Sequence, residues 1–474
     1  MEQQMSLSGA IPGLGERFGL STKRIHYRSQ LVAYPYFLIS AILFFLQIIF
    51  GLLTAAYYIW PTYWDQVLPF NISRSTHLNL LIFWLLLGLM GAAFYFIPEE
   101  TKSELFSPKM ALIQFGILVV AGLGTLFSFW FLQASRGKPF TESPMPWPIL
   151  IALGVVLFLI NVGTTIVRAK RWTAIAVVLF AGMLGLALTY LINFVFFQNL
   201  TVDYYWWWWI IHLWVEGTWE LIAAAVMAYL LIALTGVEAS RMTRWLYAEV
   251  FLTLATGIIG IGHHYYWIGT PKYWLLWGAI FSAFEPLPIA LMVYDTFVSM
   301  RHRQVEPSNK VTWYFLVGSA VSHFIGAGLW GFAQTLPQIN KWTHGTQITA
   351  SHGHFAFFGA FGMLVLAAIY YMLPKLKGAE RIQETRGKWA FWLMTVGITL
   401  MVFSFTIAGV VQTYLYRLVG LDFMLVRTQY VGFWIFFVWL FGLVVFAPGV
   451  TIYLWDFFAL GRPAKGRTAI SAAA

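Results

Sequence analysis

The sequence predicts an all-α, polytopic integral membrane protein with twelve transmembrane helices. Of its 474 residues, 60% are hydrophobic and only 10% are charged, against about 25% charged residues in a typical soluble domain. Apolar runs of about 20 residues, the length that spans a bilayer as a helix, recur along the whole chain. Strands of a membrane barrel would instead alternate over about ten residues. These observations exclude a soluble fold and a β-barrel.

Short charged or Pro/Gly-rich breaks separate the apolar runs and define the expected spans. The runs lie at residues 32–60, 76–98, 109–132, 147–167, 173–197, 206–234, 244–269, 273–300, 311–337, 348–373, 388–417 and 429–457. Because the connections are short, we expect a single twelve-helix membrane domain over residues 32–457. A cytoplasmic N-terminal segment (1–31) and a cytoplasmic C-terminal tail (458–474) flank it.

The distribution of Lys and Arg predicts the orientation. Of these 29 residues, 22 fall on the side that holds the N-terminus and 7 on the opposite side. The positive-inside rule then places both termini in the cytoplasm. The net charge of +10 is explained by this topology and by contact with anionic lipid, so no nucleic-acid partner is expected.

The sequence contains no Cys. This excludes disulfides, thiolate metal sites, iron–sulfur clusters and haem attached covalently through C-x-x-C-H. Any bound metal must therefore be held by His, carboxylate, Tyr or Met.

Six of the ten histidines fall within spans in the outer half of the bilayer, on four different helices. They are His77, His212, His263, His264, His352 and His354. A single such residue is more often a packed core histidine than a ligand. Six at one depth favour metal sites, because polar groups in hydrocarbon are costly and imidazole is the commonest metal ligand.

His352 and His354 stand two residues apart, a rotation of about 200° on an α-helix, so they face nearly opposite directions. A helix between two large planar cofactors would need this arrangement. In the absence of thiolates, two haems with axial imidazoles fit. One haem requires a second axial ligand from another helix, and His77 is available at the same depth.

His212 and Glu216 are four residues apart on one helix face, and Glu220 continues that face. His263 and His264 arrive from the next span at a matching depth. Three imidazoles and one carboxylate predict a non-haem metal site, and the carboxylate favours iron over copper. Alternatively, Glu216 and Glu220 satisfy polar neighbours within the bundle, but two carboxylates in one apolar helix favour a functional role.

Other polar residues of the spans and loops admit two interpretations. Glu285, in the sequence F-E-P-L-P, is either a proton carrier or the partner of a proline kink. His344, in an outer loop, either contacts a haem propionate or caps a helix. His323 is expected to be a core histidine, and the aromatic run 204–209 an interfacial belt.

Four local motifs identify the chain with a known family. H-L-W-V-E-G-T-W-E-L (212–221), G-H-H-Y-Y-W-I-G (262–269), F-S-A-F-E-P-L-P (281–288) and H-G-T-Q-I-T-A-S-H-G-H (344–354) resemble the catalytic subunits of cytochrome-c-dependent nitric oxide reductases. These enzymes are members of the haem–copper oxidase superfamily. The similarity runs over essentially the whole chain.

The resemblance implies a haem–copper oxidase-like bundle that reduces two NO to N2O and water. It implies that His77 and His354 bind a low-spin haem b and that His352 is the proximal ligand of a high-spin haem b3. As desolvated carboxyl groups inside the membrane, Glu220 and Glu285 are expected to relay protons. The ligands that the resemblance implies for a non-haem iron are His212, Glu216, His263 and His264.

The resemblance also implies partners and a location. A small membrane-anchored c-type cytochrome subunit and a soluble periplasmic electron donor would deliver electrons, because no c-type haem can attach to this chain. The protein would lie in the bacterial inner membrane, with its active site in the periplasmic half.

One loop departs from the family pattern. After the third span the family carries R-E-F-L-E-Q-P, whose first carboxylate binds calcium, whereas this chain has K-P-F-T-E-S-P at 138–144. Pro139 replaces that carboxylate and only Glu142 remains. Calcium binding is therefore left open, with Glu142 as a residue that either holds an ion or marks where protons enter.

Three alternatives predict different features. A haem–copper terminal oxygen reductase would hold copper and, in its most familiar version, a Tyr four residues after the first ligand, where this chain has Glu216. A secondary transporter would show repeated halves and broken helices at the midplane. A non-catalytic electron carrier would need the bis-histidine haem but not the other ligands.

Overall fold

The computed structural model describes residues 18–61, 69–284, 286–379 and 382–460, and within these ranges the chain forms helices and no strands. Twelve helical segments are long and apolar enough to cross a membrane, which confirms the predicted fold class. The terminal segments predicted to be cytoplasmic lie mostly outside the described residues.

The spans are built from one to five helical elements each, several of them interrupted by a short π or 3₁₀ segment. In chain order they are η1 (Arg28–Val32) with α2 (Ala33–Ile59); α4 (Phe70–Thr101); α5 (Pro108–Phe131); α6 (Trp147–Ala169); α7 (Ala174–Ile192); α8 (Leu200–His212), η2 (Leu213–Trp219) and α9 (Glu220–Thr235); α10 (Ala239–Ile259) with η3 (Gly260–His264); α11 (Tyr273–Ser282) with α12 (Leu287–Arg303); α13 (Lys310–Ser322), η4 (His323–Trp330) and α14 (Gly331–Thr335); α16 (Gln347–His354), η5 (Phe355–Gly362) and α17 (Met363–Leu376); α18 (Glu384–Gln412) with η6 (Thr413–Leu418); and α19 (Phe423–Leu425), η7 (Val426–Val431), α20 (Gly432–Phe441), η8 (Gly442–Phe446) and α21 (Ala447–Ala459). The short helix α15 (Pro337–Thr343) connects the ninth and tenth spans.

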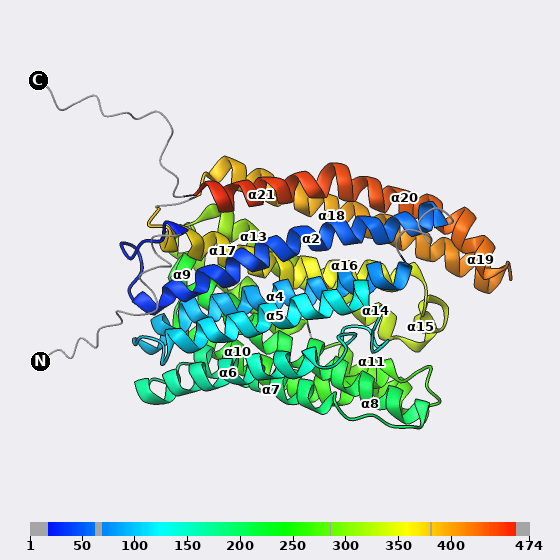
Figure 1. Ribbon diagram of the computed structural model, residues 1–474, viewed down its shortest axis with the longest axis horizontal. Helices are drawn as coiled ribbons and strands as arrows, with labels where there is room; N and C mark the ends of the chain where they lie inside the picture. Colours follow the sequence, from blue (N-terminus) through cyan, green and yellow to red (C-terminus); the bar gives the residue numbers. More distant parts are fainter. Residues whose placement is uncertain (1–17, 62–68, 285, 380–381, 461–474) are drawn as a thin grey trace, which may run out of the picture.

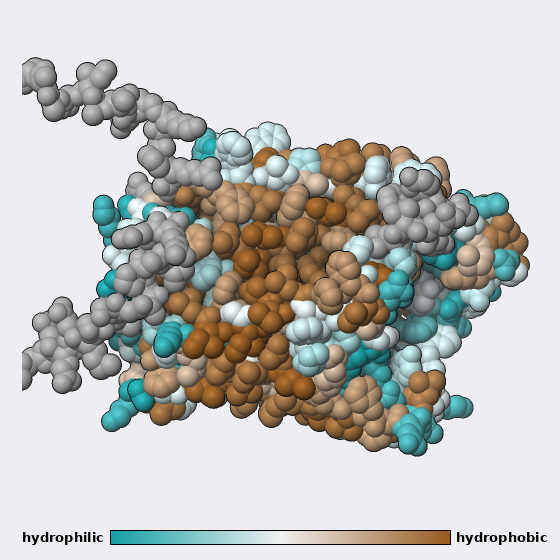
Figure 2. Space-filling view, viewed as in Figure 1, coloured by the Kyte–Doolittle hydropathy of each residue, from teal (hydrophilic) through white to brown (hydrophobic). Residues whose placement is uncertain are grey.

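The helices run roughly side by side along the long axis of the molecule, and α2 begins at the same end at which α21 finishes (Figure 1). A broad hydrophobic band covers the middle of the visible surface, and hydrophilic residues gather towards both ends (Figure 2). Large apolar side chains such as Phe131 and Phe251 remain exposed within helices. Exposed apolar side chains are stable where the surrounding solvent is hydrocarbon. The helices also suit that solvent, because a helix pairs its backbone polar groups internally.

Polar side chains mark where several spans begin. Each accepts a hydrogen bond from a backbone N–H of the first helical turn, which would otherwise have no partner. These capping residues are Ser107 of α5, Thr173 of α7, Asn199 of α8, Asn309 of α13 and Asp422 of α19.

Three spans form the centre of the bundle. The apolar windows of Phe70–Thr101, Leu200–Thr235 and Gln347–Leu376 are 94%, 83% and 83% buried, whereas those of the other spans are at most 50% buried. Four of the six histidines predicted as intramembrane ligands lie on these central spans, as do the two neighbouring carboxylates of the sixth span. The most enclosed helices therefore carry most of the candidate site.

The second span begins earlier than its hydropathy predicts. We expected it from residue 76, but α4 begins at Phe70, so His77 lies in its third turn. The polar residues Ser73 and Thr76 are fully buried. The Ser73 hydroxyl lies 2.8 Å from the Thr54 hydroxyl of α2. This hydrogen bond satisfies the buried polar group, so the helix includes polar residues that hydropathy alone assigns to a loop.

Candidate metal centre

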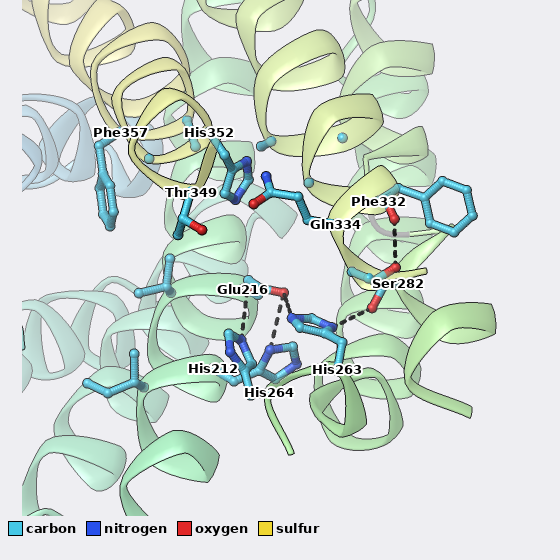
Figure 3. Close-up of a pocket in the computed structure, with 18 of the residues that line it drawn as sticks. His212, Glu216, His263, His264, Ser282, Phe332, Gln334, Thr349, His352 and Phe357 are labelled. Atoms are coloured by element: carbon cyan, nitrogen blue, oxygen red, sulfur yellow. Dashed lines mark hydrogen bonds and ion pairs between the residues drawn. The ribbon is translucent and has the colours of Figure 1, made fainter. Parts of the chain in front are cut away.

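Four side chains from two neighbouring spans converge on one point. His212, Glu216, His263 and His264 each place one ligand atom within 4.8 Å of the others. Glu216 lies at the centre: one of its oxygens, Oε2, is 3.1 Å from His212 Nδ1 and 3.6 Å from His263 Nε2. The other, Oε1, is 3.3 Å from His264 Nε2. Figure 3 shows the three imidazoles grouped around this carboxylate.

Departures from regular α-helix shape both halves of the cluster. α8 changes at its last residue, His212, into the π segment η2, which carries Glu216. On the other span, η3 is a short 3₁₀ stretch that ends with His263 and His264. Single-turn π segments frequently accompany functional sites, because they redirect side chains within an otherwise continuous helix.

Ser282 fixes the orientation of His263. Its hydroxyl lies 2.8 Å from His263 Nδ1 and donates to the carbonyl of Gly278 at 2.7 Å. A hydroxyl has one hydrogen, so Ser282 accepts from the protonated Nδ1 of His263. The lone pair of His263 is then on Nε2, the atom that faces Glu216. Ser282 had no distinguishing signal in the sequence.

His212 and His264 are held by burial and by aromatic packing. His212 is only 1% exposed; its Nδ1 lies 3.1 Å from Glu216 Oε2, and its Nε2 has no polar partner. The Trp208 ring stacks on His264 with centroids 4.4 Å apart, so part of the aromatic run expected at the interface packs against the site. A buried imidazole nitrogen without a partner is costly, and a metal ion would satisfy it. The donor set of three imidazoles and a carboxylate thus fits a non-haem metal.

A cavity of about 470 Å³ adjoins the cluster and is lined across from it by His352 (Figure 3). His352 Nδ1 donates to the carbonyl of Gly326 at 2.8 Å, which leaves Nε2 free as a ligand atom. Gly331 packs against this ring so closely that an added Cβ would lie 2.8 Å from His352 Cε1.

His77 and His354 form a separate pair. His77 Nδ1 donates to the carbonyl of Gln47, and His354 Nδ1 donates to the carbonyl of Ala350, both at 2.8 Å. Their Nε2 atoms therefore remain available, and the two ring centroids are 6.2 Å apart. Two metal–imidazole bonds of about 2.0–2.1 Å, with about 1.1 Å from each nitrogen to its ring centroid, require about 6.3 Å. The pair thus fits one shared metal between two axial imidazoles.

His323 is buried, as expected of a core histidine, and it also contacts one of the predicted proton-relay carboxylates. His323 Nε2 lies 2.8 Å from Glu220 Oε2, and both residues are at most 4% exposed. Both residues also line the cavity. The sequence signal was available, since His323 is a polar residue in the middle of an apolar span.

Glu142 lies in the connection between α5 and α6 and is 2% exposed. Its Oε2 accepts a hydrogen bond from Asn79 Nδ2 at 3.0 Å, and its Oε1 has no partner. Burial raises the pKa of this carboxyl to about 7, against the opposing effect of Arg74. Asn79 lies two residues after His77, so this loop is tied to the helix that carries one member of the histidine pair.

His344 and Glu285 complete the predicted set. The His344 ring stacks on Trp267 at 4.9 Å, and its backbone carbonyl accepts from Arg417 at 2.5 Å. It lines the cavity, and burial together with Arg417 lowers its pKa. Glu285 lies outside the described residues.

Comparisons with known proteins agree with this arrangement. The family model of cytochrome c and quinol oxidase polypeptide I matches residues 31–444. A nitric oxide reductase subunit of Stutzerimonas stutzeri is 40% identical over 92% of this chain and 96% of its own. A cbb3-type cytochrome c oxidase subunit of the same organism is 22% identical over 78% of this chain and 81% of its own.

The fold has a solved counterpart in a haem–copper terminal oxidase dimer studied by cryo-electron microscopy. The two chains superpose with a TM-score of 0.76 at 16% sequence identity, covering 94% of this chain and 86% of the other. Family membership implies haem and a metal at a shared centre, which the histidine pair, His352 and the carboxylate cluster fit. This multi-pass membrane protein therefore belongs to the cytochrome c and quinol oxidase polypeptide I family, and within it lies close to a nitric oxide reductase.

Proposed function

We propose that this chain is the catalytic subunit of a nitric oxide reductase, in which two NO, two electrons and two protons give N2O and water. The observation that carries the proposal is Glu216, which stands among the three imidazoles of the cluster. It occupies the position where the familiar oxygen reductases carry a tyrosine. The 40% identity to a nitric oxide reductase subunit along almost the whole chain supports the same function.

The cofactors follow from the donor atoms. His212, Glu216, His263 and His264 would hold a non-haem iron, because a carboxylate among imidazoles favours iron over copper. His352 would be the proximal ligand of haem b3, and His77 with His354 would hold a low-spin haem b. When bound, these groups supply electrons and Lewis acidity to the substrate.

The protein contributes position and a dry cavity. His352 faces the carboxylate cluster across one cavity, so two small substrates held there would meet without the entropic cost of a bimolecular encounter. Apolar side chains form much of the remaining lining, among them Ile211, Val215, Phe332, Phe357 and Phe361. This lining suits an uncharged diatomic substrate and keeps bulk water away.

Carboxyl groups would deliver the two protons. Glu220 is in hydrogen-bond contact with His323 at the cavity wall and is well placed to pass a proton into it. Glu285 would be a second carrier, on the strength of its position in F-E-P-L-P alone. Glu142, as a buried carboxyl of the loop, would admit protons or hold a calcium ion, and His344 would contact a haem propionate.

Partners and location follow from the charge distribution and the absence of Cys. Because this chain cannot bind a haem through C-x-x-C-H, we infer that a small membrane-anchored c-type cytochrome subunit passes electrons to it from a soluble periplasmic donor. The excess of Lys and Arg on the N-terminal side supports a bacterial inner-membrane orientation with both termini in the cytoplasm and the metal centre in the periplasmic half.

Metal and haem analysis of the purified complex, combined with an NO electrode, tests the proposal. We expect NO consumption with N2O formation, two haems per chain in two spin states, non-haem iron and no copper. Copper in place of iron, with O2 reduction and no NO reduction, would instead identify a terminal oxygen reductase.

A further inference from the structure

Glu249 is a buried carboxyl group for which the mechanism above has no role. It lies on α10 and is 2% exposed. Its Oε1 accepts a hydrogen bond from Thr253 Oγ1 at 3.3 Å, and its Oε2 has no hydrogen-bond partner. A buried polar atom without a partner is costly, so a purely structural role does not explain why this position carries an acid.

Glu249 lies beside the span that carries Glu220. α9 packs directly against α10, and Gly217, three residues before Glu220, lies next to Thr253, the hydrogen-bond partner of Glu249. Glu220 in turn contacts His323 of η4 at 2.8 Å. His323 Nδ1 is itself buried without a partner. Three protonatable side chains from three elements therefore form one buried group, here called the inner triad: Glu249, Glu220 and His323.

The inner triad continues away from the metal cluster. Glu220 follows Glu216 by four residues along the sixth span, and Glu249 precedes His263 by fourteen residues along the seventh. Glu220 and His323 line the cavity, whereas Glu249 is not part of its lining. The order from the cavity inwards is thus Glu220 with His323, then Glu249.

Two carboxyl groups that interact in a desolvated interior share protons, because both cannot be ionised at low cost. The inner triad has one hydrogen bond within it and two unpaired polar atoms. It can therefore gain or lose a proton by small rearrangements among its own members, without exchange with bulk water at each step.

We propose that the inner triad is a proton reserve for NO reduction. Glu249 holds the stored proton and acts on the reaction only through Glu220, to which it passes that proton. The proposal rests on the proposed function. In each turnover two NO take up two electrons from the c-type cytochrome donor and two protons, and one of these protons leaves the carboxyl group of Glu249. It ends in the product water, and the Glu249 carboxylate is reprotonated from solvent before the next turnover.

The test compares E249Q with E238Q in the complete enzyme complex. Gln keeps the shape of Glu but cannot release a proton, and Glu238 is an exposed residue at the start of the same helix. Fully reduced enzyme is mixed with NO, and proton uptake is followed with a pH-sensitive dye alongside the oxidation of the haems. The pH profile of steady-state turnover is measured in parallel.

We expect E249Q to slow the proton-coupled phase of the first turnover and steady-state NO reduction by at least about tenfold, within the usual range for proton-transfer groups. The pH profile should also change, whereas haem spectra and iron content should match the wild type. E238Q should behave as the wild type, and E249D should restore part of the rate.

Three results would overturn the inference. The first is an E249Q variant with the wild-type rate and pH profile. The second is an E249Q variant that loses haem or iron, which would indicate a structural role. The third applies if E249Q does not assemble: T253V removes the hydrogen bond to Glu249, and an unchanged pH profile in T253V would refute the proposal. A wild-type complex without NO reduction would instead refute the proposed function, so the two failures are distinguishable.

Discussion

The two sets of intramembrane histidines are held in opposite ways. In the carboxylate cluster, side chains hold side chains: Glu216 contacts three imidazoles, and Ser282 orients one of them. In the pair, each imidazole is held by a backbone carbonyl, and the rings keep 6.2 Å between their centroids. The first arrangement is closed around a point and suits a small ion. The second keeps two ligand atoms apart and suits a metal in the centre of a larger group.

The comparison explains why the two sites should respond differently to substitution. The cluster depends on a few interacting side chains, so removal of one changes the whole donor set. The pair depends on where the helices place their carbonyls, so its sensitive positions are those where the backbone of one helix approaches a ring.

The largest effect is expected for Glu216→Ala. Loss of the carboxylate removes one of the donor atoms and leaves three imidazoles without their common partner. We expect NO reduction to fall by more than about 100-fold, beyond the 10–100-fold typical of residues that only support metal ligands. The absorption spectrum of the low-spin haem should be unchanged, because Glu216 belongs to the carboxylate cluster and not to the histidine pair. Undiminished turnover would remove Glu216 from the mechanism.

A smaller effect on the same cluster is expected for Ser282→Ala. Without the hydroxyl, His263 Nδ1 loses its acceptor and the ring is no longer fixed with Nε2 towards Glu216. Residues that orient a metal ligand in this way typically contribute 10–100-fold to metal affinity. We therefore expect iron to be lost at a chelator concentration at least about tenfold lower than for the wild type.

The matched control for this substitution is Ser319→Ala. Ser319 is also a buried serine whose hydroxyl donates to a helix carbonyl, that of Ala360, and it is not bonded to a histidine of either site. Equal iron loss in both variants would show that helix packing, and not the orientation of His263, accounts for the effect.

The arrangement of the histidine pair, His77 and His354, can be tested by the substitution Gly51→Ala on α2. A Cβ at this position would lie 2.8 Å from His77 Cε1, so Gly51→Ala must displace the ring. Overpacking of this kind typically costs about 1–3 kcal/mol. We expect a changed low-spin haem spectrum and slower electron delivery, with normal iron content. Gly116→Ala on α5 is the control, because a Cβ there meets no atom within 4 Å.

The sequence allowed the fold class, the number of spans and the convergence of polar residues to be predicted, because hydrocarbon makes each buried His or Glu conspicuous. The opposite directions of His352 and His354 also followed from helix geometry. Ser282, Gln47 and Gly51 could not be predicted, since each acts through a contact between distant helices. The π segment η2, which carries Glu216, could not be predicted either, because the sequence pattern is that of a continuous helix.

Two further residues are conspicuous in the sequence, but their contacts with the site are not predicted by the sequence pattern. His323 was expected to be a core histidine, yet it contacts Glu220. Trp208 was grouped with an interfacial aromatic run, yet it stacks on His264. In both cases the residue type is visible in the sequence and its partner is not, because the partner comes from another span.

The smallest effect is expected at Glu142 and concerns thermal stability. Unlike Glu216, which contacts imidazoles, this buried carboxyl group accepts its hydrogen bond from the amide of Asn79. Burial raises its pKa from 4.5 to about 7, so the folded state favours the protonated form. The corresponding stability is fully present below about pH 4.5 and is lost as the pH rises through about 7. A shift of this size corresponds to at most about 3 kcal/mol. In calcium-free buffer, the thermal midpoint of the wild type should therefore fall across this window.

Glu142→Gln cannot ionise, so its thermal midpoint should fall less between pH 4.5 and 7, whereas the exposed Glu306→Gln should follow the wild type. Calcium separates the two roles left open for this carboxyl. An ion bound by Glu142 would stabilise the ionised form, so added calcium would raise the midpoint of the wild type at pH 7 but not that of Glu142→Gln. Because Pro139 has no carboxylate to share the ion, we expect no such difference. Its appearance would show that Glu142 pairs with a cation, the role proposed for Glu216, and not with a proton.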